Sequence, residues 1–407
     1  MTKQKGIGKL IRRYFNVDGG IDILFFVFLM AILVIGLIMM YSASYVYAYQ
    51  YTKNHDSAFY FKRQFIWVLL GVAVMFVISR INYKTFETLF AVGGTAVSWL
   101  LLGVALIMPA HNGTHRHIYI GSFQFQPSDL AKFALILTLA ALLDKYHDVI
   151  VSKKPLQSPL ARKVNERVGK PVLNYSVRVI LMLGLIIMIY AGLVIAGSHL
   201  SGTILIVAIG IVMLYLGEVR GKWFVAGAIG AVLLIALLWN TDLLKGYMQD
   251  RIYAWQHKDY DPLGARWQIN QALYAIGSGG LFGKGLGQST LKHLYVSEPQ
   301  NDMIFSIVVE EIGLVGAGII LILFALLIWR GVVIGINCPD RYGALIAMGV
   351  VFQVGIQVIL NILVATDSIP NTGIPFPFFS YGGTAMLVNL AEMGFVLSIS
   401  RRSKIRR

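Results

Sequence analysis

Long apolar runs constrain this chain more than any other feature of its sequence. A helix that crosses the hydrocarbon core of a bilayer needs about 20 mainly apolar residues, and runs of that kind recur from residue 22 to residue 400. They predict an all-α polytopic membrane protein with ten transmembrane helices. The predicted spans are residues 22–48, 61–80, 85–108, 128–144, 178–197, 201–217, 223–240, 303–329, 343–365 and 378–400.

The composition excludes the other broad classes of protein. Hydrophobic residues make up 57% of the 407 residues and charged residues 14%, whereas about 25% of a soluble protein is charged. The polar surface is therefore too small to cover a water-soluble particle, which excludes a soluble enzyme. The apolar content also excludes a disordered chain, and the single cysteine, Cys338, excludes a disulfide-stapled fold.

Basic residues gather in alternate connections between the predicted spans. With ten spans, all of these connections lie on the same side of the membrane as both termini, and the positive-inside rule assigns that side to the cytoplasm. Most of the net charge of +15 is thereby explained by topology, so we predict no nucleic-acid binding. The main basic segments are the N-terminus 1–21, the loop 145–177 and the tail 401–407.

The connection 241–302 lies on the opposite, extracytoplasmic side. It has about 60 residues, far more than most connections, and its Trp, Tyr and Gly content predicts a folded functional element rather than a tether. Its segment GSGGLFGKGLGQS (277–289) resembles a phosphate-binding loop, but Ser278 and Gly285 occupy positions that the nucleotide pattern reserves for other residues. The glycines either let backbone approach a ligand or membrane surface closely or simply form flexible turns.

Ionisable residues inside the predicted spans are candidates for function because hydrocarbon disfavours them. In the fourth span, Asp129 and Lys132 are three residues apart and can pair on one helix face. The eighth span contains Glu310 and Glu311. These four residues either support a substrate groove or bond neighbouring helices together, and the sequence leaves both alternatives open.

Asp302 stands where the long outer loop returns to the membrane, beside the apolar residues Met303 and Ile304. A carboxylate at a partly dehydrated boundary tends toward a raised pKa unless a cation opposes it, and a raised pKa suits a general base. Aspartate is also a favoured N-cap residue of helices. The residue type by itself does not show whether Asp302 is a general base or the N-cap of the following helix.

Motifs along nearly the whole chain, in the family's order, resemble the FtsW/RodA/SpoVE family, also called SEDS proteins, which implies one membrane domain over 1–407. Departures from the family pattern are Asp129 in place of glutamate, His117 in place of tryptophan and Met303 in place of phenylalanine; none removes a charge. The matching motifs are YSAS at 41–44, KRQFIW at 62–67, QPSDLAK at 126–132, HLSGT at 199–203, RIYAWQHKDYDPLGARWQINQALYAIGSGGLFGKGLGQSTLKHLYVSEPQNDMIFSIVVEEIGLVG at 251–316 and IPNTGIPFPFFSYGG at 369–383.

The resemblance implies a peptidoglycan glycosyltransferase of the bacterial plasma (inner) membrane. Such enzymes polymerise lipid II, carried on undecaprenyl pyrophosphate, and work with a class B penicillin-binding protein in division or elongation complexes. Asp302 matches the family's essential acidic residue. The resemblance does not decide whether a divalent cation helps.

Joining an α-linked sugar pyrophosphate through a β-1,4 bond inverts the anomeric carbon, so one carboxylate must take the proton of the incoming hydroxyl while cations receive the pyrophosphate. We expect Asp302 to be that base. The candidate pyrophosphate-binding residues are Lys292, Arg251, Lys284, Arg266 and Arg116, with Lys292 and Arg251 preferred because they lie in family motifs.

Two other functions remain open at this stage. A lipid II flippase would also be polytopic, but it would need cations lining a cavity at mid-depth, whereas the polar segment here lies on one side. A non-catalytic scaffold for a transpeptidase is the second alternative. Within the family, SEPQND before the eighth span and HLSGT favour the FtsW division branch over SpoVE-like and RodA-like members.

Overall fold

Helices make up nearly all the regular structure in the described part of the chain. The computed structural model describes residues 19–89, 93–109, 115–120, 123–151, 175–238, 247–264 and 266–404. The helices that follow one another from the N-terminus are Ile23–Tyr51 (α2), Phe59–Arg80 (α3), Thr85–Leu89 (α4), Thr95–Ile107 (α5), Pro127–Lys145 (α6), His147–Val151 (α7), Tyr175–Ala196 (α9), Leu200–Leu216 (α10) and Gly221–Leu238 (α11). They continue with Tyr247–Gln256 (α12), Trp267–Gly279 (α13), Ile304–Ile336 (α14), Arg341–Ala365 (α15) and Gly383–Ser400 (α16).

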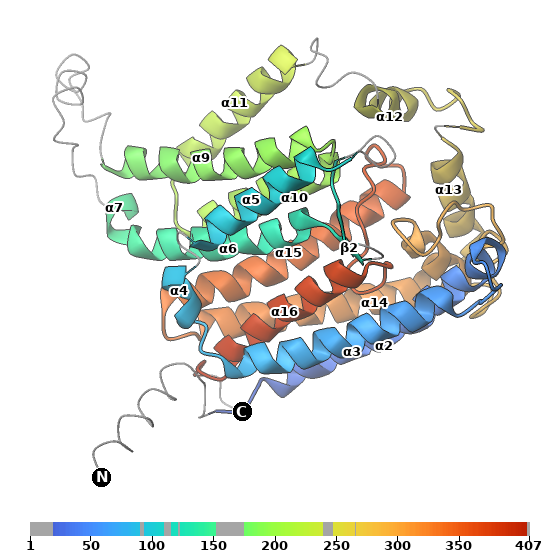
Figure 1. The fold of residues 1–407 in the computed structure, drawn as a ribbon, viewed down its shortest axis with the longest axis horizontal. Coiled ribbons are helices and arrows are strands. Elements are labelled where there is room, and N and C mark those ends of the chain that lie inside the picture. The colour runs from blue at the N-terminus through green and yellow to red at the C-terminus, as the bar shows by residue number, and fades with distance from the viewer. Residues whose placement is uncertain are drawn as a thin grey trace.

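Two short strands, Ile118–Ile120 (β1) and Phe123–Phe125 (β2), form an antiparallel pair just before α6. In Figure 1 the long helices run side by side, and α12 and α13 lie at the end of the bundle opposite the start of α2 and the end of α16. The described part of the connection 241–302 is therefore gathered at one end of the bundle.

Apolar length identifies several helices that can cross a membrane. Among the described residues, six helices are long and apolar enough: α2, α3, α9, α14, α15 and α16. The helices α5 and α10 are apolar but shorter. The predicted class, a mostly helical polytopic membrane protein, is confirmed, while the count of ten spans stays a prediction.

The helix α6 lies at the centre of the bundle, between α5, α10 and α15. The predicted span 128–144 that corresponds to it is as short as any of the ten and is the most polar, yet nearly every side chain from Pro127 to Ala141 is buried. Its charged residues can be buried because they pair with each other, as described below, and a buried charge without a partner would be far more costly.

One predicted span differs from the helix that forms. In the third span, 85–108, the structure describes α4 and α5, while residues 90–92 lie outside the described residues. The tenth was predicted to begin at residue 378, but α16 begins at Gly383. Of the five residues before it, Phe378 and Phe379 extended the predicted apolar run because they pack in the core, where Phe379 contacts Phe376 with ring centroids 5.1 Å apart, and not because they belong to a helix.

Candidate active site

Asp302 lies on the turn that leads into α14, held by two neighbouring helices. Its backbone carbonyl accepts a hydrogen bond from Asn361 Nδ2 of α15 at 2.7 Å. Its Oδ1 accepts one from Gln268 Nε2 of α13 at 3.3 Å. The residue in the N-cap position of α14 is Met303, which makes no capping bond through its side chain. The N-cap interpretation of Asp302 is therefore wrong, and its carboxylate is directed toward the outer loop.

Burial raises the pKa of Asp302 above its ordinary value, and this is the largest electrostatic effect on the group. The backbone N–H of Asp302 and the charge of Arg251 oppose the rise, and Arg116 adds a weaker opposing effect. Glu298, four residues before, raises the pKa further. The carboxylate is thus a stronger base than a solvated aspartate, with two guanidinium groups in electrostatic range.

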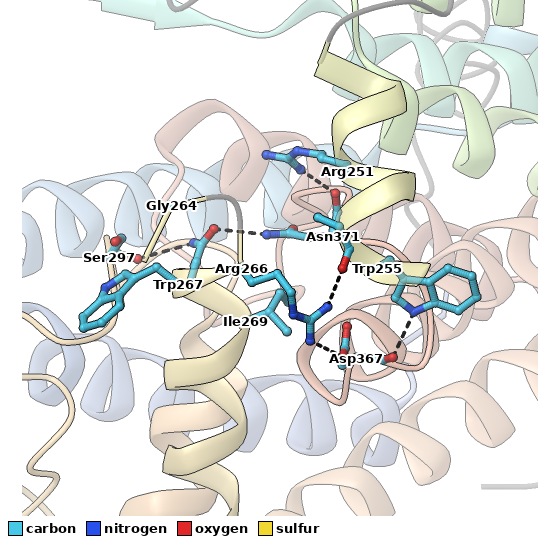
Figure 2. Close-up of a pocket in the computed structure, with 11 residues that line it drawn as sticks. Arg251, Trp255, Gly264, Arg266, Trp267, Ile269, Ser297, Asp367 and Asn371 are labelled. Atoms are coloured by element: carbon cyan, nitrogen blue, oxygen red, sulfur yellow. Dashed lines mark hydrogen bonds and ion pairs between the residues drawn. The ribbon is translucent and has the colours of Figure 1, made fainter. Parts of the chain in front are cut away.

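A pocket of about 240 Å³ adjoins Gln268, the residue bonded to this carboxylate, and is lined by residues from α12, α13 and the segment after α15 (Figure 2). Gln268, which donates to Asp302, lines the pocket. Its Oε1 accepts a hydrogen bond from Asn371 Nδ2 at 3.1 Å, and the Asn371 carbonyl accepts one from Arg251 Nη1 at 2.5 Å. A continuous row of hydrogen bonds therefore joins Asp302 to Arg251 across the pocket.

Two tryptophans fix the walls of this pocket. Trp255 Nε1 donates to the Asp367 carbonyl at 3.0 Å, and Trp267 Nε1 donates to the Tyr295 carbonyl at 2.9 Å (Figure 2 draws both rings). Since both indole N–H groups are bonded to backbone, the rings have little freedom to turn. They offer flat apolar faces beside the polar side chains of Gln268 and Asn371, a combination that suits a sugar ring.

Arg266 lines the same pocket but its charge is already neutralised. Its Nη2 lies 2.6 Å from Asp367 Oδ2, and both side chains are almost fully buried. Its Nη1 donates to the Ala254 carbonyl at 2.9 Å. The structure thus places this predicted pyrophosphate-binding residue where it joins α12 and α13 to the segment after α15.

The predicted cations Lys284 and Lys292 lie in a separate cluster with Glu310 and Glu311. Lys284 Nζ is 2.7 Å from Glu310 Oε1, and Lys292 Nζ is 2.7 Å from Glu311 Oε1. Lys292 and both glutamates are wholly buried. Ser42 Oγ of α2 donates to Glu311 at 2.7 Å, and Ser289 Oγ donates to Glu310. The structure therefore pairs these two lysines with protein carboxylates.

This cluster holds the glycine-rich loop against a break in α14. At Gly313 the helix has φ +70°, and the loop supplies hydrogen bonds around the break. Lys284 N and Gly285 N donate to the carbonyls of Glu310 and Glu311, both at 2.9 Å, and Leu314 N donates to the Gly280 carbonyl at 3.0 Å. A Cβ on Gly283 would lie 2.2 Å from the Glu311 carbonyl oxygen. The glycines serve close contact with α14, an interpretation that the sequence did not offer.

A second ionic group lies inside the bundle. Lys132 Nζ is 2.9 Å from Asp129 Oδ1, which confirms the predicted pairing along α6. Near them, Glu392 of α16 accepts hydrogen bonds from Gln353 Nε2 of α15 at 2.8 and 3.0 Å. Gln353 and Glu392 thus bond α15 to α16 in the interior, while the ion pair of Asp129 and Lys132 lies within α6.

His199, which the sequence analysis passed over, connects this interior to the outer loops. Burial is the main cause that lowers its pKa to about 3, helped by the charges of Arg116 and Lys132, so its ring is neutral. Its Nδ1 lies 3.3 Å from Ser128 Oγ at the start of α6. Gln268, Asn371 and His199 all stand in motifs that carried the family resemblance, and that was the signal that could have found them.

Among the residues that the structure describes, no group of three or more His, Cys, Asp or Glu side chains is arranged to hold a metal ion.

The helical bundle and its pocket define a polytopic membrane protein in which the carboxylate of Asp302, with a raised pKa, lies in electrostatic range of guanidinium groups. The chain belongs to the FtsW/RodA/SpoVE family, whose model, described as a cell cycle protein, matches residues 22–405. The predicted family is confirmed by this match.

Named relatives cover almost the whole chain. Stage V sporulation protein E of Bacillus subtilis is 38% identical over 386 residues, which cover 94% of this chain and 98% of the relative. The probable peptidoglycan glycosyltransferase FtsW of Geobacter sulfurreducens is 33% identical over 388 residues, covering 94% and 96%. The name of the second relative agrees with the predicted class of activity.

Solved structures share the fold. A chain from a study of how a peptidoglycan synthase complex coordinates polymerization and crosslinking gives a TM-score of 0.70 at 24% identity, covering 94% of this chain and 98% of that one. The rod shape determining protein RodA of Thermus thermophilus gives 0.64 at 23% identity, covering 95% and 98%.

Proposed function

We propose that this protein is a peptidoglycan glycosyltransferase that polymerises lipid II into β-1,4-linked glycan strands on the outer face of the bacterial plasma membrane. The observation that carries the proposal is the half-buried carboxylate of Asp302, whose surroundings raise its pKa, beside a pocket lined by Arg251 and two tryptophans. Family membership supports the same activity.

In the proposed reaction, Asp302 accepts the proton of the sugar 4-hydroxyl of the acceptor as that oxygen attacks the anomeric carbon of the donor. The bond between this carbon and the pyrophosphate breaks, and the configuration inverts. The pyrophosphate leaves ionised, so it needs cations and no proton. Arg251 and Arg116 are the best-placed cations because both act electrostatically on Asp302.

The remaining predicted site residues have supporting roles in this proposal. Arg266 shapes the pocket through its ion pair with Asp367, and Lys284 and Lys292 hold the glycine-rich loop on α14. The ion pair of Asp129 and Lys132 supports α6 beside the proposed substrate path. A divalent ion, if it takes part, would be held by Asp302 and the substrate phosphates, because Mg²⁺ commonly uses one or two carboxylates with phosphate oxygens. Loss of activity on chelation and its return with Mg²⁺ would test that role.

We propose the topology of ten spans, with both termini in the cytoplasm and 241–302 outside. A class B penicillin-binding protein is the proposed partner, and a structural neighbour from a complex that polymerises and crosslinks supports it. Whether the pair works in division, elongation or sporulation complexes is decided by depletion, which would give filaments, round cells or failed spores. Sequence motifs favour division, while the relatives include both FtsW and a sporulation protein.

The test is purified protein with lipid II in detergent. Asp302→Asn should lower the polymerisation rate by at least ~100-fold, the usual contribution of a general base, without changing the melting temperature. Asp259→Asn is the matched control, because Asp259 is an exposed carboxylate of the same outer loop.

Polymer formed in detergent cannot come from a flippase or a scaffold, since neither makes a glycosidic bond. Wild-type activity in a folded Asp302→Asn protein would remove the assignment of the base. Absence of polymer from the wild-type protein, even with its transpeptidase added, would contradict the proposed function itself.

A further inference from the structure

The exposure of α14 changes abruptly at Gly313. Every side chain from Ile304 to Glu311 is buried by protein. This part of α14 therefore presents none of its apolar side chains to lipid. Beyond the break, apolar side chains are exposed along one face: Leu314 is 53% exposed, Val315 48%, Ile319 55% and Ile322 60%. In a helix that spans a membrane, an exposed apolar face meets lipid. The lipid-facing part of α14 therefore begins at Gly313.

The glycine-rich loop lies at this same level. Leu314 N and Val315 N donate to the carbonyls of Gly280 and Leu281, both at 3.0 Å. A Cβ on Gly313 would lie 2.5 Å from the carbonyl carbon of Phe282, so the two backbones touch. The loop and the break in α14 thus share one depth along the helix.

The loop presents apolar side chains to its surroundings. Phe282 is 79% exposed, Leu281 61% and Leu286 57%. Leu281 is bonded through its backbone to Val315, so its apolar surface adjoins the exposed face of α14. Large exposed apolar patches are rare on surfaces that meet water.

The length of α14 places this patch at the edge of a bilayer. Arg330, which forms an ion pair with Asp22 at the start of α2, at 2.8 Å, marks the opposite end of the apolar region. Seventeen residues separate Arg330 from Gly313, a rise of about 26 Å in a helix. The hydrocarbon core is about 30 Å thick. Gly313 and the loop against it therefore lie within the outer edge of that core.

We propose that the loop segment 281–286 is inserted among the acyl chains at the outer edge of the bilayer. This proposal rests on the proposed topology, in which α14 crosses the membrane. The occupant of the patch is lipid, because the patch continues the lipid-facing side of α14. The two ion pairs, Lys284 with Glu310 and Lys292 with Glu311, hold the segment there.

The insertion fixes the height of the candidate active site. From Gly313 to Ile304 the first part of α14 rises by at most about 14 Å, and Asp302 is two residues beyond. Residues 303–312 of the predicted eighth span therefore lie above the hydrocarbon core in this proposal. The segment 281–286 thereby anchors the pocket at a set distance above the lipid that carries the substrate.

The test uses a fluorescent reporter and requires no catalysis. In a Cys338→Ser chain, Phe282→Cys is labelled with an environment-sensitive dye, and the full protein is reconstituted in phosphatidylglycerol and phosphatidylcholine vesicles. We expect blue-shifted emission, strong quenching by lipids brominated near the top of the acyl chain, and weak quenching by aqueous iodide. Lys258→Cys, exposed in the same outer loop, is the aqueous control, and Ile319→Cys is the deeper lipid-facing control.

Quenching of the Phe282→Cys label by iodide to the extent seen at Lys258→Cys would overturn the proposal. A label shielded from both iodide and brominated lipid would also overturn it, because protein rather than lipid would then cover the patch. Neither outcome depends on glycosyl transfer, so failure here is distinguishable from failure of the proposed function.

Discussion

At the scale of single residues, the chemistry of Asp302 depends on groups that the chain folds around it. Its carboxylate accepts a hydrogen bond from Gln268, which lies 34 residues earlier in the sequence. Burial raises its pKa, and the charge of Arg251 limits the rise. Both effects arise from the tertiary structure and can be tested by measuring how activity depends on pH.

The ionised form of Asp302 is the one that accepts a proton, so activity is lost as the pH falls through the raised pKa. We expect the acid limb of the kcat/KM profile to lie above the ordinary aspartate pKa of about 3.9. Arg251→Gln removes an opposing charge, so it should move this limb to higher pH in addition to weakening binding. Lys258→Gln, an exposed charge change in the same loop, should leave the limb in place. A limb that stays fixed or falls in Arg251→Gln would contradict the assigned base.

The pair of Lys292 and Glu311 makes a separate prediction about stability. Both side chains are fully buried, and Lys292 Nζ lies 2.7 Å from Glu311 Oε1. Lys292→Met leaves a buried carboxylate without its cation, so the free energy of unfolding should fall by about 3 kcal/mol. The melting temperature in detergent should fall. The double variant Lys292→Met, Glu311→Leu should lose less free energy of unfolding than the two single variants lose together, because neither charge is then left without its partner. Additive losses would show that the two groups are not coupled.

At the scale of elements, the break in α14 decides how the outer loop is held. Gly313→Ala should loosen the loop, because φ is +70° there and the new Cβ would lie 2.4 Å from both Gly283 N and the Leu281 carbonyl oxygen. Hydrogen exchange of residues 280–292 should become faster. Gly318→Ala, on the same helix with open space at its Cβ, should leave exchange unchanged or slow it, since alanine favours helix. Equal exchange in both variants would mean that the break does not hold the loop.

The elements themselves followed from local pattern to a large extent. Apolar runs predicted α2, α3, α14 and α15 to within a few residues at their starts. The errors arose where apolar residues had another use, as before α16, where Phe378 and Phe379 fill the core without forming a helix. Hydrophobicity reports burial, and burial is shared by helices and by irregular segments that lie in a core.

At the scale of the whole molecule, the proposed topology places Lys258 outside the cell and Lys404 inside. Both side chains are exposed, so each can be replaced by cysteine in a Cys338→Ser background. A membrane-impermeant thiol reagent should label Lys258→Cys in intact cells and Lys404→Cys only after permeabilisation. Labelling of both positions in intact cells, or the reverse order, would contradict an even number of spans with cytoplasmic termini.

The sequence by itself determined the class and the family, because apolar length and long ordered motifs are properties of neighbouring residues. It also identified Asp302 as a candidate base and the pairing of Asp129 with Lys132, which are one helical turn apart. It did not determine which cations face a substrate. Arg266 meets Asp367 across 101 residues and Lys292 meets Ser42 across 250, and only the tertiary structure brings such groups together. The sequence shows which residues carry positive and negative charges, whereas folding decides which partner neutralises each charge.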